Sequence, residues 1–486
     1  MESKKLISKK AKSGTFWSSM TTIISRSLGF LFTVIATRLL SPDDYGVMAI
    51  ILGFMAIFQS TTQTGFPAAI IQKKDNFNTL LNTAWTVEVL RFIFLFIIFN
   101  VLASPISNYF SNESLKIYIH FASISYIFLG FRNIGVVFLR KNLDFYTLFL
   151  FESIPLILRG LSTVILAFYL KNIWALIYGK LIGDFILFIG SFYFHSYRPK
   201  FELNLKKFNI LADFGVWILL STIISSARKN IIYFFIGKNL GFQKNGTFER
   251  SQTFSSLIFN DFSDILWRIG FPILSKIQSS KKDVSKFFLK MLNTGMLFGF
   301  PISIGLYFVS DELVYLFLGE KWTAISDIIK IFSLFGFISF VSAPYNILTQ
   351  SIGYPKLLTY SSLFSLILFI GSLSYLSYSN LNLINIAYAM IISDFIYLFL
   401  VIICSLSIIK INYLNNIRIF ITIFISTSIL AYSLNVINEL FINLSTHAML
   451  SLKISSGMII YGVMILLLKI LLSIKFEKML VFYEKK

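Results

Sequence analysis

The sequence predicts an all-α, polytopic integral membrane helical bundle of about 14 transmembrane helices, with two six-helix lobes and two C-terminal helices. Three observations predict it. The composition is 56% hydrophobic and 14% charged, whereas soluble domains are about 25% charged. Apolar runs long enough to cross a bilayer recur along the whole chain. A stretch near the start returns 200 residues later, which indicates two related lobes.

The apolar runs define the expected helices. Most runs are about 18 to 25 residues long, unlike the ten-residue alternating strands of outer-membrane barrels. The lysine-rich start resembles a signal peptide, but the run that follows is too long and lacks a cleavage site, so we interpret it as a retained first span. The expected centres lie near Gly29, Phe58, Ile93, Ile127, Ile157, Leu181, Ile224, Phe259, Phe298, Leu334, Leu366, Ile391, Ile425 and Val463.

The distribution of basic residues predicts the orientation. With the N-terminus in the cytoplasm, one alternating set of loops holds about 24 Lys and Arg, and the opposite set holds about 7. Both termini are then cytoplasmic. The net charge of +20 is therefore attributed to topology and to contact with anionic membrane lipid, and no nucleic-acid partner is expected.

The sequence has few cysteine and histidine side chains, of the kinds that form disulfides, bind metals or act as nucleophiles. The single cysteine, Cys404, lies inside an apolar run, and the three histidines are scattered, so no disulfide, metal site or nucleophile motif is expected. Every loop is short, which leaves no room for a separate catalytic domain. We expect no enzyme activity, no catalytic residue, no metal and no cofactor.

Residues 16–46 and 216–246 form an internal repeat. Without a gap, Trp17 aligns with Trp217, the run Thr22 to Ser25 with Thr222 to Ser225, and Gly46 with Gly246. Six helices separate the copies, and an even number of spans preserves direction, so the repeat is parallel. The lobes are predicted at 1–205 and 206–410, with a terminal helix pair at 411–486. Such repeats are typical of transporters that use alternating access.

The first helix carries a charge, Arg26, near its middle. An arginine at the bilayer centre costs roughly 2.5–3.5 kcal/mol on insertion scales. With a turn of about 100° per residue, Arg26 shares one face of this helix with small and polar residues: Ser18, Thr22, Ser25, Gly29, Thr33 and Thr37. The arginine is therefore expected to face protein or water.

Further charges lie inside the expected spans. The candidate substrate-binding cations are Arg26, Arg132, Arg159, Arg228, Lys229 and Arg268. The spacings of Glu88–Arg91 and Lys180–Asp184 favour structural ion pairs. Glu152, Asp261 and Asp264 could pair with an arginine between the lobes, or could titrate and couple transport to H⁺ or Na⁺. Arginines without an obvious partner on their own helix indicate an anionic ligand, because the guanidinium binds phosphate bidentately.

Several local patterns resemble a known family. These are "RLLSPDDYGVMAI" after the first helix, "FPILSKIQ" near residue 275, and "LGEKWTAISDIIKIFSLFGF" followed by "QSIGYPKLL". Over most of residues 10 to 410 the chain resembles the Wzx-type polysaccharide and O-antigen flippases. The similarity is greatest to the WzxC-like branch of the multidrug/oligosaccharidyl-lipid/polysaccharide exporter superfamily.

The resemblance implies a bacterial inner-membrane transporter. Its substrate would be an undecaprenyl-diphosphate-linked oligosaccharide, moved from the cytoplasmic to the periplasmic leaflet through a cationic cavity for capsule or lipopolysaccharide biosynthesis. Polysaccharide polymerase and chain-length proteins are the implied partners. The two extra C-terminal helices, with Lys453 and Lys469, resemble those that form a lipid-tail groove in peptidoglycan-precursor flippases.

Two other functions stay open at this point. A membrane polysaccharide polymerase or ligase would also bind the diphosphate lipid with arginines, but it would need catalytic groups and a large periplasmic loop. An ion-coupled small-molecule antiporter of the same superfamily would favour acidic residues on its first helices, where this chain has more arginine than acid.

Overall fold

A computed structural model describes residues 2–63, 78–142, 144–204, 216–409 and 417–471 of the chain, and these form helices and connecting segments without a strand. They divide into two compact units, residues 1–246 and 247–486. The lobe boundaries that the repeat predicts stay a prediction.

The helices of the first unit are, in chain order, α1 (Glu2–Leu39), α2 (Pro42–Thr61), α4 (Asn78–Tyr109), α5 (Ser114–Phe131), η1 (Ile134–Val136), α6 (Val137–Lys141), α7 (Phe145–Leu170), α8 (Trp174–Tyr193) and α10 (Val216–Asn239). Helix α11 (Phe242–Ile277) begins in this unit and continues in the next. The second unit continues with α12 (Lys281–Leu318), η2 (Glu320–Trp322), α13 (Ala324–Ser351), α14 (Pro355–Tyr378), α15 (Leu383–Ile408), α16 (Ile417–Leu440) and α17 (Thr446–Leu471).

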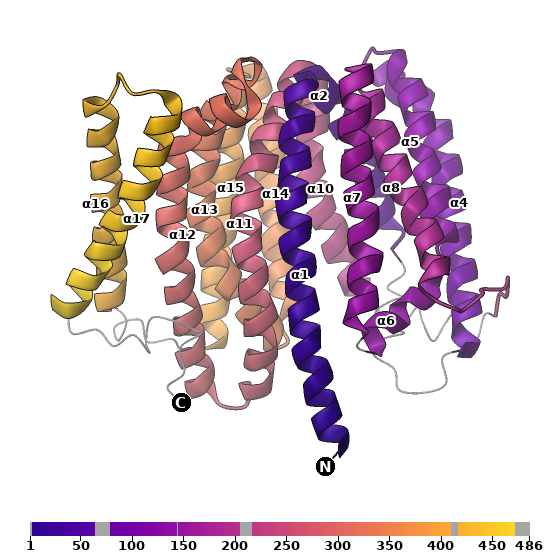
Figure 1. Ribbon diagram of the computed structural model, residues 1–486, viewed down its shortest axis with the longest axis horizontal. Helices are drawn as coiled ribbons and strands as arrows, with labels where there is room; N and C mark the ends of the chain where they lie inside the picture. The colour runs from indigo at the N-terminus through magenta and orange to yellow at the C-terminus, as the bar shows by residue number, and fades with distance from the viewer. Residues whose placement is uncertain (1, 64–77, 143, 205–215, 410–416, 472–486) are drawn as a thin grey trace. The chain divides into compact units, whose positions relative to one another are not determined.

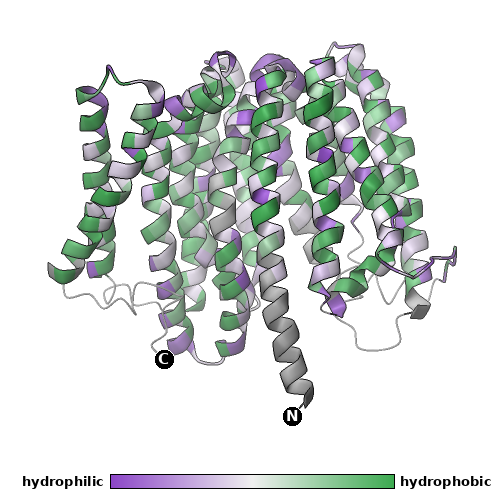
Figure 2. Ribbon diagram, in the orientation of Figure 1, coloured by the Kyte–Doolittle hydropathy of each residue, from purple (hydrophilic) through white to green (hydrophobic). Residues whose placement is uncertain are grey.

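The predicted fold class is confirmed. Each of the fourteen expected centres falls in a separate long helix. Within the described ranges, twelve helices are long and apolar enough to span a membrane, and the chain is a multi-pass membrane protein. The other two long helices, α10 and α11, fall short because charged residues interrupt them. Figure 2 shows hydrophobic residues along most of the length of helices such as α7 and α16.

The first unit is held together by helix pairs. Helix α4 packs on α5, α7 on α8, and α10 on α2, and Figure 1 shows α1 beside α7. The indole of Trp17 on α1 contacts the ring of Tyr146 on α7, with centroids 4.7 Å apart. The core joins α2, α4, α5 and α8 through fully buried residues such as Ile50, Phe99, Ile119 and Ile177. These contacts stabilise the unit through close van der Waals packing between the helices.

The second unit has its own core. Helix α12 packs on α13, and α13 packs on α15, with Phe288, Met291 and Val401 fully buried. The antiparallel pair α16 and α17 lies against α12 (Figure 1). The Lys453 ammonium of α17 lies 2.5 Å from the Glu312 carboxylate of α12 and donates to the Phe308 carbonyl at 2.8 Å. A buried ion pair therefore fixes α17 to the unit.

The predicted repeat is reflected in the helix boundaries. Helices α1 and α10 end at Leu39 and Asn239, and α2 and α11 begin at Pro42 and Phe242. Each pair of boundaries differs by 200 residues, the offset of the sequence repeat. The start of α2 is fixed by a capping box, in which the Ser41 hydroxyl accepts from the Asp44 N–H and the Asp44 carboxylate accepts from Ser41.

Candidate functional site

The first unit contains a cavity of about 870 Å³. Its walls come from α2, α4, the end of α5, the η1–α6 corner, α7, α8 and α10. The polar residues that line it are Gln59, Ser60, Gln63, Glu88, Arg91, Arg132, Glu152, Thr222, Ser225, Ser226, Lys229 and Asn230. Trp85, Phe92 and Phe151 add aromatic surface. Charged, amide, hydroxyl and aromatic groups therefore meet in a space at the upper end of the 300–1,000 Å³ typical of ligand sites.

Three of the predicted site residues line this cavity: Arg132, Lys229 and Glu152. Arg132 directly follows α5, while Lys229 and Glu152 lie on α10 and α7, so helical periodicity alone could not bring them together. Arg132 and Glu152 are half-buried, whereas Lys229 is exposed. Among the described residues, no hydrogen bond or ion pair involves the Lys229 ammonium, which leaves it available to an anionic ligand.

A tight corner presents Arg132 to the cavity. The backbone leaves the helical conformation at this residue, with φ −56° and ψ 137°. The next residue, Asn133, is fully buried and holds the corner from two sides. Its side-chain N–H donates to the Tyr197 carbonyl at 2.6 Å, and its backbone N–H donates to the Ser191 hydroxyl at 2.9 Å. The position of Arg132 thus depends on contacts with the end of α8 and the chain beyond it.

Residues 195–202, which follow α8, form a strap behind the cavity wall. The Phe201 ring lies 4.8 Å from the ring of Trp85, a cavity residue. The Glu202 N–H donates to the Thr86 hydroxyl at 2.9 Å, and the Tyr197 hydroxyl donates to the Asn82 amide oxygen. Burial, reinforced by Glu202, raises the pKa of Tyr197 to about 12, so the phenol keeps the proton that it donates. The strap therefore supports α4 at the cavity.

One histidine belongs to this strap. The His195 Nδ1 atom accepts from the Tyr197 N–H at 3.1 Å, and its ring stacks on Phe138 with centroids 5.9 Å apart. Burial, and secondarily the Arg198 guanidinium, lower the pKa of His195 from its ordinary value of 6.5. The ring is therefore neutral near pH 7, as its role as an acceptor requires.

The position of Lys229 follows from the packing of α10 on α2. Phe234 of α10 stacks on Phe54 of α2, with ring centroids 4.1 Å apart. One turn before Phe234, Asn230 lies beside Gly53, where the missing side chain lets the two helices approach. This contact places Lys229 and the preceding hydroxyl residues of α10 in the wall.

The predicted pairs Glu88–Arg91 and Lys180–Asp184 are present, at 2.6 and 2.7 Å. The Glu88–Arg91 pair also lines the cavity, whereas its three-residue spacing indicated only a structural ion pair. The amides Gln59 and Gln63 were missed as well. The polar run "QSTTQT" at the end of an apolar helix was the signal that could have identified them.

The other predicted site residues lie elsewhere. Arg26 is half-buried on α1, Arg159 is exposed on α7 against Gly183, and Arg228 is half-buried on α10; none of them lines the cavity. In the second unit, Asp264 and Arg268 are exposed on α11, and the Asp261 side chain lies outside the described part of the chain. Their substrate-binding and ion-coupling roles stay predictions. In the part of the chain that the structure describes, no group of His, Cys, Asp and Glu could hold a metal ion.

The second unit contains an apolar groove of about 500 Å³ between α12, α16 and α17. Leu297, Pro301, Leu430, Met458 and Tyr461 are among its lining residues, and Lys453 contributes a charge. The groove occupies the helices for which the sequence predicts a lipid-tail site. The side chain of Lys469, the second predicted lysine, lies outside the described part.

Comparison with known proteins gives consistent results. The family described as polysaccharide biosynthesis protein matches residues 35–327. An uncharacterized membrane protein in the cps region of Klebsiella pneumoniae is 26% identical over 347 residues, which cover 70% of this chain and 71% of the relative. The lipopolysaccharide biosynthesis protein WzxC of Escherichia coli is 24% identical over 344 residues, 70% of each chain.

Solved structures share the fold. The lipid II flippase MurJ, in an inward closed conformation, matches with a TM-score of 0.73 and 19% identity, over 94% of this chain and 99% of MurJ. An inward-facing multidrug resistance MATE family transporter matches with a TM-score of 0.61 and 13% identity, over 78% and 93% of the two chains. The resemblance predicted from the sequence motifs is confirmed.

Proposed function

The chain belongs to the polysaccharide biosynthesis protein family, and from this premise we propose that it is a lipid-linked oligosaccharide flippase. It turns an undecaprenyl-diphosphate-linked oligosaccharide from the cytoplasmic to the periplasmic leaflet by alternating access, for the synthesis of a cell-surface polysaccharide. It acts in the bacterial inner membrane with both termini in the cytoplasm, and it supplies substrate to a polysaccharide polymerase and its chain-length partner.

The observation that carries the proposal is the cavity that contains Arg132 and Lys229. A diphosphate and its sugars cannot enter hydrocarbon without a large loss of hydration energy. A cavity with fixed cations, amides and hydroxyl groups replaces that hydration, while the polyprenyl tail stays in the bilayer. Trp85 and Phe92 provide apolar faces of the kind that pack against sugar rings.

Two further features support parts of the proposal. The apolar groove between α12, α16 and α17 matches the chemistry of a polyprenyl chain. Glu152 is a carboxylate in the same cavity as Arg132, and we assign it to ion coupling by H⁺ or Na⁺. Glu152→Gln should therefore abolish the dependence of transport on the ion gradient. Unchanged dependence would exclude Glu152 from ion coupling.

The direct test measures which leaflet holds the lipid-linked oligosaccharide. Spheroplasts of the source organism lacking this gene are labelled with membrane-impermeant periodate and hydrazide, which react with sugar diols on the outer face only. The proposal expects the oligosaccharide to accumulate unlabelled, and the native gene to restore labelling. Normal labelling with only the polymer missing would show that the protein acts after translocation, as a polymerase or ligase would.

A further inference from the structure

Two ion pairs of the first unit are closely matched but differ in location. In the Glu88–Arg91 pair the side chains are 16% and 12% exposed, and in the Lys180–Asp184 pair both are 12% exposed. Both pairs join residues of one helix, three or four positions apart. Of these four residues, only Glu88 and Arg91 line the cavity. The first pair therefore has access to a ligand in this cavity.

The guanidinium of Arg91 is directed at Glu88. Its Nε and Nη2 atoms donate to the same carboxylate oxygen of Glu88, at 3.1 and 2.6 Å. Its Nη1 atom makes longer contacts with the end of α2, at 3.5 Å to the Gln59 carbonyl and 3.4 Å to the Thr62 hydroxyl. The planar donor edge that would bind a phosphate is thus occupied by a carboxylate of the protein itself.

We propose that Glu88 is an internal competitor that sets the charge a ligand needs in order to engage Arg91. This inference rests on the proposed function, because it concerns the anionic headgroup of the same substrate. A diphosphate carries more charge and more acceptor oxygens than one carboxylate, so it displaces Glu88. A single phosphodiester, the headgroup charge of ordinary membrane phospholipids, does not.

The contact between Glu88 and Arg91 would help a transporter that is surrounded by phospholipid to select its substrate. Without Glu88, the cavity would present Arg91, Arg132 and Lys229 with Glu152 as the remaining carboxylate among its lining residues. Such a site would bind any phosphate and would release its substrate slowly, whereas transport requires binding weak enough to allow exit. Glu88 thus makes the site selective for diphosphates and also lowers the affinity for them.

The test uses full-length protein purified in detergent, with geranylgeranyl diphosphate and the phosphodiester geranylgeranyl methyl phosphate as probes of equal tail length. Binding of each probe is measured for the native chain, Glu88→Gln and Asp184→Asn. Glutamine keeps the shape of Glu88 and an acceptor oxygen but removes its charge, which weakens the contact with Arg91. We expect Glu88→Gln to bind the phosphodiester about tenfold more tightly, a change of about 1.4 kcal/mol, and to lose most of the preference for diphosphate.

Asp184→Asn is the matched control, because it removes the carboxylate charge from a similarly buried pair away from the cavity. Its selectivity should equal that of the native chain. A native preference for diphosphate that Glu88→Gln leaves unchanged would overturn the inference and leave the proposed function standing. Weaker binding of both probes by Glu88→Gln, with a lower unfolding temperature, would show that Glu88 is structural. A native chain that binds neither probe would overturn the proposed function itself.

Discussion

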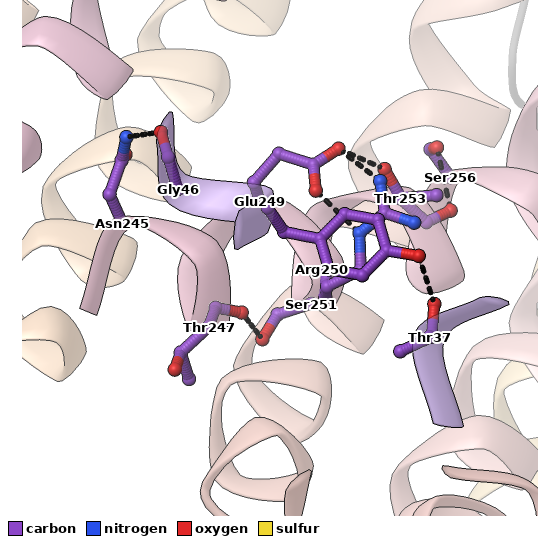
Figure 3. A network of polar contacts seen from close by, with 10 residues as sticks. Thr37, Gly46, Asn245, Thr247, Glu249, Arg250, Ser251, Thr253 and Ser256 are labelled. Atoms are coloured by element: carbon purple, nitrogen blue, oxygen red, sulfur yellow. Dashed lines mark hydrogen bonds and ion pairs between the residues drawn. The ribbon is translucent and has the colours of Figure 1, made fainter. Parts of the chain in front are cut away.

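Gly46 and Gly246 lie 200 residues apart in the chain and contact each other reciprocally. A Cβ atom on Gly46 would overlap the carbonyl of Phe242, and a Cβ atom on Gly246 would overlap the carbonyl of Pro42. Pro42 and Phe242 are also 200 residues apart. Figure 3 shows the adjacent Asn245 side chain donating to the Gly46 carbonyl, at 2.9 Å. The two copies of the repeat therefore meet through equivalent backbone atoms.

This contact makes a steric prediction. Alanine at either glycine must displace a helix backbone rather than a flexible side chain, so Gly46→Ala and Gly246→Ala should each lose roughly 1–3 kcal/mol of stability by overpacking. Thermal unfolding in detergent measures the effect. Gly371→Ala on α14 is the control, because no atom lies within 4 Å of its Cβ position. Equal unfolding temperatures for all three variants would contradict the close approach.

Adjacent cations on α10 allow a test of the cavity. Lys229 lines it and Arg228 does not, although the sequence predicts substrate binding for both. Lys229→Ala should reduce transport to the outer leaflet at least about tenfold, the effect of losing one charged contact of about 1.4 kcal/mol. Arg228→Ala at equal abundance should retain more transport. The reverse order, measured by the leaflet assay, would place the substrate path on the other face of α10.

The helices could be predicted from the sequence because the length and hydropathy of each span can be read directly from its residues. The same holds for local pairs: the three-residue spacing of Glu88 and Arg91 and the four-residue spacing of Lys180 and Asp184 place each pair on one helix face. The repeat could be detected because Trp17, the run Thr22 to Ser25, and Gly46 recur 200 residues later at Trp217, Thr222 to Ser225, and Gly246.

The cavity could be predicted only in part. Arg132, Glu152 and Lys229 were identified as charges inside spans, but their meeting depends on how α5, α7 and α10 pack. The strap could not be predicted, because the bonds from Asn133 to Tyr197 and from Thr86 to Glu202 join residues 64 and 116 positions apart. Nothing in the local sequence encodes such partners.

The strap should respond to pH through His195. Because the folded-state pKa lies below 6.5, the contribution of this histidine to strap stability is present above about pH 6.5 and is lost as the pH falls through the folded-state pKa. Hydrogen exchange, corrected for intrinsic rates, should show weaker protection of the Tyr197 and Glu202 amides at pH 5 than at pH 7.5. His195→Asn keeps an acceptor but does not titrate, so its protection should not change. An equal pH response in this variant would assign the effect to another group.

Removing only one partner of the buried Lys453–Glu312 pair, which joins α17 to α12, should destabilise the protein strongly. Lys453 and Glu312 side chains are 2% and 12% exposed, so Lys453→Met leaves a carboxylate buried among apolar residues. A loss of about 3–5 kcal/mol is typical when one partner of such a pair is removed. We expect a clear fall in unfolding temperature for Lys453→Met, and recovery in the double variant Lys453→Met, Glu312→Gln, which buries no charge.

The control for this cycle is the Lys330–Asp311 pair, whose side chains are 27% and 56% exposed. Solvent screens such a pair, so Lys330→Met should change stability by about 1 kcal/mol or less. If Lys453→Met reduced the stability as little as Lys330→Met, water or lipid headgroups would have to reach the Glu312 carboxylate. Additive effects in the double variant would show that the two charges do not stabilise each other, and the attachment of α17 to α12 would then rest on apolar contacts and on the bond from the Tyr461 hydroxyl to the Leu297 carbonyl.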